Sequence, residues 1–121
     1  MRREDQAVAG PRWRAILEAR WRDRVQEVTD LSLAYHGAVG DAPDGGADKR
    51  ARQLARRTVA ARQRLADTED ALGRLAAGHF GECEQCGAPI PVVLLFAAPE
   101  SRYCPDCATA ALRTDARERV H

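Results

Sequence analysis

Two Cys-x-x-Cys pairs are the feature that most limits how this chain can fold. Cys83 and Cys86 form the first pair, and Cys104 and Cys107 form the second. Each pair can turn tightly enough to direct two thiolates at one ion, and the intervening segment 87–103 has the length found in four-cysteine zinc modules. Four protein ligands leave no coordination position for water or substrate. One structural zinc ion is therefore predicted, and not a catalytic one.

Disulfide pairing or a thiol redox centre is the alternative for the same cysteines. The N-terminal residues contain no apolar core of the length that a secretory signal needs, and the longest apolar run, Pro89–Pro99, is too short to span a bilayer. We therefore expect a cytoplasmic protein without membrane contact. In that reducing compartment, paired cysteines are more readily interpreted as metal ligands. The three histidines have no partner at ligand spacing and are assigned no role.

Two long helices are predicted before the cysteines. The first begins near Gly10-Pro11, ends at Gly37, and has a face formed by Trp13, Leu17, Trp21, Val25, Val28, Ser32 and Tyr35. The second runs from about Asp48 to Ala77, where Gly78 can stop it. Its seam alternates steps of four and three residues, as in a coiled coil: Leu54, Thr58, Ala61, Leu65, Thr68, Leu72 and Leu75.

The predicted fold is mostly α, an antiparallel two-helix coiled-coil hairpin with a small four-cysteine zinc finger and a short C-terminal helix. A tail over 1–10 precedes the hairpin, which covers 11–77 with a tip loop at about 37–47. The finger and the C-terminal helix occupy 78–121, and this helix is expected to pack back on the metal module. An ordinary three-helix bundle is the alternative.

A basic band crosses the middle of a chain whose net charge is only +1. Between residues 49 and 64 there are seven lysines and arginines and no acid, namely Lys49, Arg50, Arg52, Arg56, Arg57, Arg62 and Arg64. Such a band can contact phosphates, but it is more often the solvated flank of a coiled coil. Because no aromatic residues are interleaved to stack on bases, direct DNA binding is not expected.

The segment Val92–Ala98 is nearly all apolar. It could form a protein-interaction or dimerisation surface, or it could pack against the C-terminal helix, which we favour. No Ser/His/Asp set, Walker loop or dinucleotide fingerprint is present in the sequence. We therefore do not expect an enzyme.

The segment 71–87, ALGRLAAGHFGECEQCG, continues through Ile90-Pro91 and Pro99 to Cys104-Pro105-Asp106-Cys107 and resembles the DksA/TraR family of bacterial zinc-finger proteins. The resemblance covers roughly residues 48–110. It implies a coiled-coil hairpin on a zinc finger that enters the secondary channel of bacterial RNA polymerase and places acidic tip residues near the catalytic magnesium.

The family's tip pattern is Asp-x-x-Asp-x-Ala. Asp41 and Asp44 match both aspartates, whereas Gly46 replaces the alanine. The resemblance thus implies that Asp41 and Asp44 bind the partner, while their alternative role is that of solvated turn formers beside glycine and proline. Ala98 and Ala108 stand where basic side chains of alarmone-binding members are expected, which counts against alarmone binding.

The predicted function is an RNA polymerase-binding transcription regulator that acts through the secondary channel without sequence-specific DNA binding. The sequence is also compatible with two alternative functions. One is a zinc-finger nucleic-acid-binding protein that uses the band 49–64, and the other is a protein-interaction module.

Overall fold

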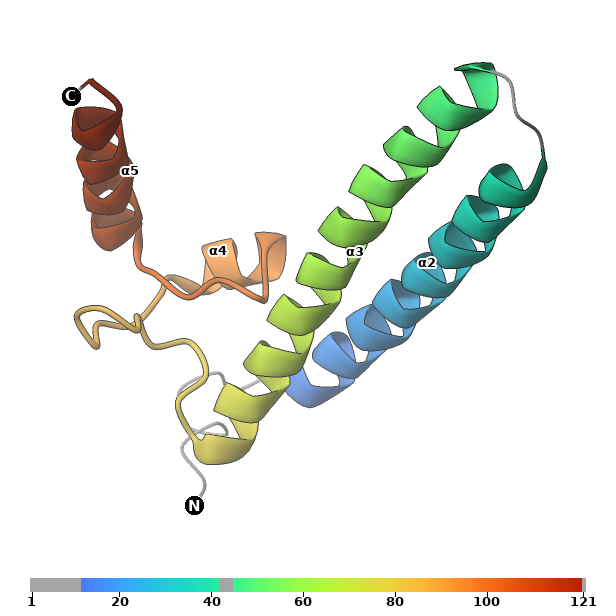
Figure 1. The fold of residues 1–121 in the computed structure, drawn as a ribbon. Helices are drawn as coiled ribbons and strands as arrows, with labels where there is room; N and C mark the ends of the chain where they lie inside the picture. Colours follow the sequence, from blue (N-terminus) through green and yellow to red (C-terminus); the bar gives the residue numbers. More distant parts are fainter. Residues whose placement is uncertain (1–11, 42–44, 121) are drawn as a thin grey trace. The chain divides into compact units, whose positions relative to one another are not determined.

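The computed structural model describes residues 12–41 and 45–120, which form four helices (Figure 1). These are α2 (Trp13–Asp41), α3 (Gly45–Ala77), α4 (Val92–Ala97) and α5 (Pro105–Val120). Within these ranges there is no strand, only an isolated antiparallel bridge between Glu82 and Pro89. The mostly α prediction is confirmed. No described helix is both long and apolar enough to cross a membrane.

The chain divides into two compact units. Residues 14–70 form one unit, which we call the hairpin unit. Among the described residues, Trp13 and the segment from 71 to 120 belong to the other, which we call the finger unit.

In the hairpin unit, α2 and α3 run antiparallel. Contacts join early positions of α2 to late positions of α3: the indole Nε1 of Trp21 donates to Glu69 Oε2 at 3.2 Å, and Glu27 forms an ion pair with Arg64. Helix α2 buries Leu17 and Ala38, and the predicted seam of α3 buries Ala61 and Thr68 completely. The Thr68 hydroxyl donates to the Arg64 carbonyl, so this buried polar group keeps a partner.

Both helices extend into the region predicted as the tip loop. Helix α2 continues through Gly37 to Asp41, and α3 begins at Gly45 and not near Asp48. The predicted end at Gly37 was therefore wrong. Glycine disfavours a helix by only about 1 kcal/mol, and the burial of Ala38 beside it supplies packing that offsets this cost.

In the finger unit, α3 ends in a Schellman motif. The Gly78 N–H donates to the Leu75 carbonyl at 3.1 Å, and the His79 N–H donates to the Arg74 carbonyl at 2.8 Å. Gly78 has φ +81°, the left-handed conformation that this motif requires after the last helical turn. The sequence-based prediction that Gly78 stops the helix is confirmed.

The core of the finger unit is small and partly aromatic. The Trp13 ring lies 5.2 Å from Phe80 and 5.0 Å from Phe96 between ring centroids, in tilted arrangements. Its buried apolar side chains include Trp13, Leu75, Phe80, Ile90, Leu95 and Pro99. They form a short core that follows the end of α3, so the metal site is expected to supply much of the remaining stability.

Helix α4 does not pack in the predicted way. Its Leu95 is 1% exposed, but Val92, Val93, Leu94 and Phe96 remain exposed, and so does Leu112 on α5. The reason is that α4 packs through Leu95 onto the turn at Gly81, where an added Cβ would lie 3.3 Å from Leu95 Cδ1. The favoured packing of this segment against the C-terminal helix was therefore wrong.

Candidate metal centre

The first cysteine pair lies in a tight reverse turn. The Cys83 N–H donates to the Ala88 carbonyl at 2.8 Å, and the Gly87 N–H donates back to the Cys83 carbonyl at 2.9 Å. Gly87 has φ +78°, so a residue with a side chain would be strained in this turn. The turn brings the Cys86 thiol back beside that of Cys83.

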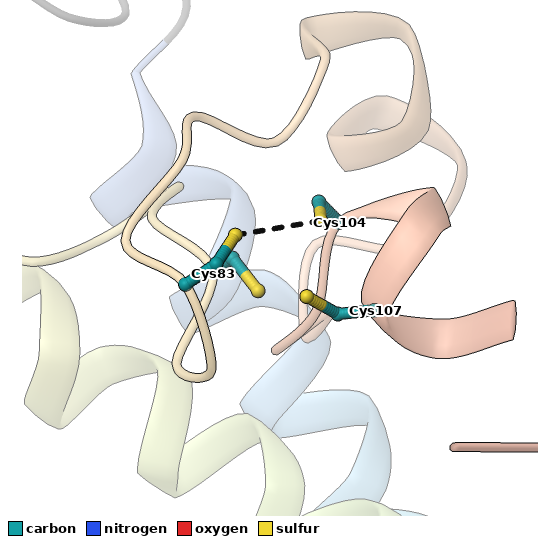
Figure 2. A group of neighbouring side chains, drawn as sticks. Cys83, Cys104 and Cys107 are labelled. Carbon is teal, nitrogen blue, oxygen red and sulfur yellow. Dashed lines mark hydrogen bonds between the residues drawn. The ribbon is translucent and has the colours of Figure 1, made fainter. Parts of the chain in front are cut away.

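The second pair is placed by the start of α5. Cys104 precedes the helix, Pro105 is its first residue, and Cys107 lies in its first turn. The Ala108 N–H donates to the Cys104 carbonyl at 2.9 Å. Figure 2 shows the Cys104 and Cys107 side chains directed toward the turn that carries Cys83.

The four sulfur atoms form one cluster. They all lie within 4.8 Å of one another, and those of Cys86 and Cys104 are 3.7 Å apart. Tetrahedral zinc with Zn–S bonds of about 2.3 Å places its sulfurs about 3.8 Å apart, whereas a disulfide needs about 2.05 Å. All four cysteines are free thiols. The spacing thus fits a metal ion and not disulfide pairing.

The thiols differ in acidity because of their surroundings. Burial raises the pKa of Cys83, but hydrogen bonds from the backbone of Cys104, Cys86 and Gln85 outweigh this effect and lower its pKa to about 6. The pKa of Cys107 is raised, chiefly by its contacts with the Cys104 and Cys86 thiols. Four crowded sulfurs cannot all carry negative charge unless a cation neutralises them, which is the role that zinc would supply.

Arg74 connects the end of α3 to the segment before the second cysteine pair. Its guanidinium donates to the Ser101 carbonyl at 3.1 Å and to the Glu100 carbonyl at 3.2 Å, and its Nε lies 3.7 Å from Glu84 Oε1. The Glu84 N–H donates in turn to the Arg102 carbonyl at 2.8 Å. These bonds hold the two cysteine-bearing segments side by side, and the sequence analysis assigned Arg74 no role.

Only one of the two predicted tip residues lies among the described residues. Asp41 is the last residue of α2, and Asp44 lies outside the described residues. Their function remains a prediction. His79 Nδ1 lies 3.2 Å from Glu82 Oε2, a local contact outside the cysteine cluster.

Comparisons with known proteins agree with this geometry. The family model described as the prokaryotic dksA/traR C4-type zinc finger matches residues 78–111. An uncharacterized protein from Aquifex aeolicus (strain VF5) is 43% identical over 44 residues, which is 36% of this chain and 30% of that protein. The chain thus matches less than a third of that relative's length.

A solved structure is similar to nearly the whole fold. The structure of transcription factor DksA2 from Pseudomonas aeruginosa matches with a TM-score of 0.74 and 21% identity, covering 88% of this chain and 83% of that one. Together with the clustered thiols, the match to the C4-type finger confirms the prediction of one structural zinc ion.

Proposed function

We propose that this chain is a member of the DksA/TraR family and a non-enzymatic transcription regulator that binds bacterial RNA polymerase directly. The match of residues 78–111 to the dksA/traR C4-type zinc finger supports this proposal. The observation that carries the proposal is the occurrence in one chain of this finger and of a fold similar to that of transcription factor DksA2. In this function the hairpin unit enters the secondary channel, and no promoter sequence is read.

The roles of the residues follow from this proposal. Cys83, Cys86, Cys104 and Cys107 hold the zinc ion, which supplies folding energy to a unit with a small core. Asp41 and Asp44 act at the tip, where their negative charge lies near the catalytic magnesium of polymerase. The finger and the flanks of the hairpin provide the contact area that holds the protein on its partner.

The experiment that tests this function uses the zinc-loaded chain and bacterial RNA polymerase. We expect direct binding and a changed lifetime of open promoter complexes. Asp41→Asn with Asp44→Asn keeps side-chain size and turn-forming capacity but removes the charge. This double variant should bind polymerase nearly as well as the parent and lose most of the effect on lifetime. A double variant as active as the parent would remove the tip assignment, and absence of binding would remove the function.

The exposure of α4 supports a second candidate, a protein-interaction module. Val93 is 73% exposed and Phe96 is 56% exposed, although both are large apolar side chains. If a protein partner binds to α4, Val93→Asp should weaken the binding of that partner to this chain. Leu112→Asp, at an α5 position that is 70% exposed, is the matched control. Equal effects of the two changes would argue against a specific α4 contact.

A further inference from the structure

The hairpin unit has a groove on one side, between the second half of α2 and the first half of α3. Its volume is about 780 Å³. The α2 wall consists of Ala34, Gly37 and Ala38, and the α3 wall consists of Arg50, Gln53, Leu54, Arg56 and Arg57. Grooves of this size can hold a ligand. Since only two packed helices line it, the groove is open along its length, and a chain can pass through it.

The two walls differ sharply in charge. From Leu31 to Gly40, α2 contains no aspartate, glutamate, lysine or arginine. The arginines of α3 therefore face small, uncharged residues in this groove. The neighbouring groove on the hairpin is different, because there Arg64 faces Asp23, Glu27 and Asp30. Arg57 borders both grooves. Arg64 is ion-paired with Glu27. The basic charge is thus compensated in the neighbouring groove, whereas Arg50 and Arg56 lie only in the groove without acids, which we call the uncompensated groove.

The arginines of the uncompensated groove are available for a ligand. Arg50 and Arg56 are exposed and line this groove alone, and the described residues provide no ion pair or hydrogen bond to their guanidinium groups. Arg57 is also exposed and can contact a ligand from the border of the groove. Each guanidinium offers five N–H donors and no acceptor. Gln53 contributes the one side-chain acceptor of the lining.

A ligand that brings only acceptors fits this lining best. Phosphate oxygens accept without donating, and arginine binds them with two parallel hydrogen bonds. A peptide would instead bring a backbone N–H donor at nearly every residue, and these donors would find few acceptors here. The chemistry of the walls therefore favours a phosphate chain over an acidic protein segment.

We propose that this groove binds the phosphate backbone of a single-stranded nucleic acid without regard to base sequence. Arg50 and Arg57 are seven residues apart on one helix face, about 10 Å along the axis, so they can contact different phosphates of a strand that lies along the groove. The groove has a volume of about 780 Å³ and lies between only two helices, so it can take one phosphate backbone but cannot enclose a duplex. No aromatic side chain lines the groove, so base stacking does not contribute and a free mononucleotide gains little from its base.

The proposal goes beyond polymerase binding and does not depend on it. It also changes the interpretation of the basic band 49–64, which the sequence analysis favoured as a solvated flank. A fully solvated flank would carry its arginines on an open helix face. Here three of them line one groove, opposite a wall without acids.

The test measures binding of a fluorescein-labelled oligothymidylate to the zinc-loaded full chain by fluorescence anisotropy over a range of salt concentrations. Three phosphate contacts predict a slope of about −2 for log K against log[salt]. The groove variant is Arg50→Gln with Arg56→Gln, the two arginines that line this groove alone. The control is Arg52→Gln with Arg62→Gln, which removes the same charge from exposed positions of α3 outside the groove.

We expect the groove variant to weaken binding by roughly tenfold at low salt and to make the salt slope shallower by about 1.4. In the control variant, the change in affinity and the change in slope should each be at most about a third of those in the groove variant. Equal losses in the two variants would overturn the proposal, because net charge alone would then explain the binding. Displacement by polyglutamate at equal charge would show that the groove takes an acidic protein segment. Displacement by tripolyphosphate at equal phosphate concentration would show that it takes a compact anion. Either result would also overturn it.

Far-UV circular dichroism verifies that each double variant keeps its helix. If the groove variant loses helix, Arg56→Gln alone is compared with Arg62→Gln. We then expect a weaker salt dependence of binding for Arg56→Gln and no such change for Arg62→Gln. Equal salt dependence in the two variants would overturn the proposal.

Discussion

Arg74 allows the stability of the finger unit to be tested at one side chain. The change Arg74→Met removes the guanidinium and keeps an apolar stem in its place. The guanidinium makes two hydrogen bonds to the carbonyls of Ser101 and Glu100, and its side chain is only 11% exposed. Hydrogen bonds from a charged donor contribute about 1.5–3 kcal/mol each. Taking the lower value for both bonds, we expect a loss of about 3 kcal/mol.

The ion pair with Glu84 should add little to this loss. Its atoms are 3.7 Å apart, and the Glu84 side chain is 36% exposed, so solvent screens the interaction. Partly exposed pairs of this kind contribute at most about 1 kcal/mol. The change Glu84→Gln is therefore the matched control, and it should cost less than about 1 kcal/mol. The change Arg74→Lys keeps the charge but not the planar fork, so its cost should lie between the two.

Urea unfolding of the zinc-loaded chain measures these costs. Of the two tryptophans, Trp13 packs against Phe80 and Phe96 in the finger unit, whereas Trp21 lies in the hairpin unit. In a Trp21→Phe background, tryptophan fluorescence therefore reports the finger. With an m-value of about 1–3 kcal/mol/M, Arg74→Met should lower the midpoint by about 1–3 M. A midpoint equal to that of the parent, or an equal fall for Glu84→Gln, would refute the reasoning.

Two further predictions concern the metal and the hairpin. Cys107→Ser, or removal of zinc by a chelator, should abolish the near-ultraviolet circular dichroism of the finger, because zinc binding energy is folding energy for this unit. Most of the far-ultraviolet helix signal should remain. Metal analysis that finds no zinc in freshly reduced parent protein would contradict this prediction. Ala61→Leu should destabilise the hairpin unit by about 1–3 kcal/mol through overpacking, since Ala61 is completely buried. Ala60→Leu, at the exposed neighbouring position, should stay within about 0.5 kcal/mol of the parent in thermal unfolding, and equal effects would contradict the seam.

The cysteine cluster and the seam of the hairpin could be predicted because both depend on spacing along the chain. A Cys-x-x-Cys pair brings its own two thiols together, and a heptad pattern repeats within one helix. Arg74 could not be predicted in the same way. Its partners are the carbonyls of Ser101 and Glu100, 27 and 26 residues away. Every residue has a carbonyl, so the sequence carries no sign of which ones an arginine will reach.

The role of α4 could not be predicted because an apolar run has the same composition whether it is covered or exposed. The segment Val92–Ala98 would have been buried if α5 had packed on it. Its position depends instead on Leu95, which enters the small core beside Gly81. Among consecutive apolar residues, nothing in the sequence distinguishes the one that anchors the helix from those that remain exposed.

The observed and predicted versions of α2 differ at Gly37, because the prediction ends the helix there and the observed helix continues to Asp41. Gly37 lies inside α2, its φ is not positive, and an added Cβ would meet no atom within 4 Å. Gly37→Ala should therefore stabilise the hairpin unit by about 0.5–1 kcal/mol, since alanine favours a helix interior. If the helix ended at Gly37, this residue would need a left-handed conformation and the same change would be destabilising. Thermal unfolding followed by circular dichroism gives the sign directly. A lower melting temperature for Gly37→Ala would mean that α2 ends at Gly37, and the groove formed by Ala34, Gly37 and Ala38 opposite the arginines of α3 would then lose its wall.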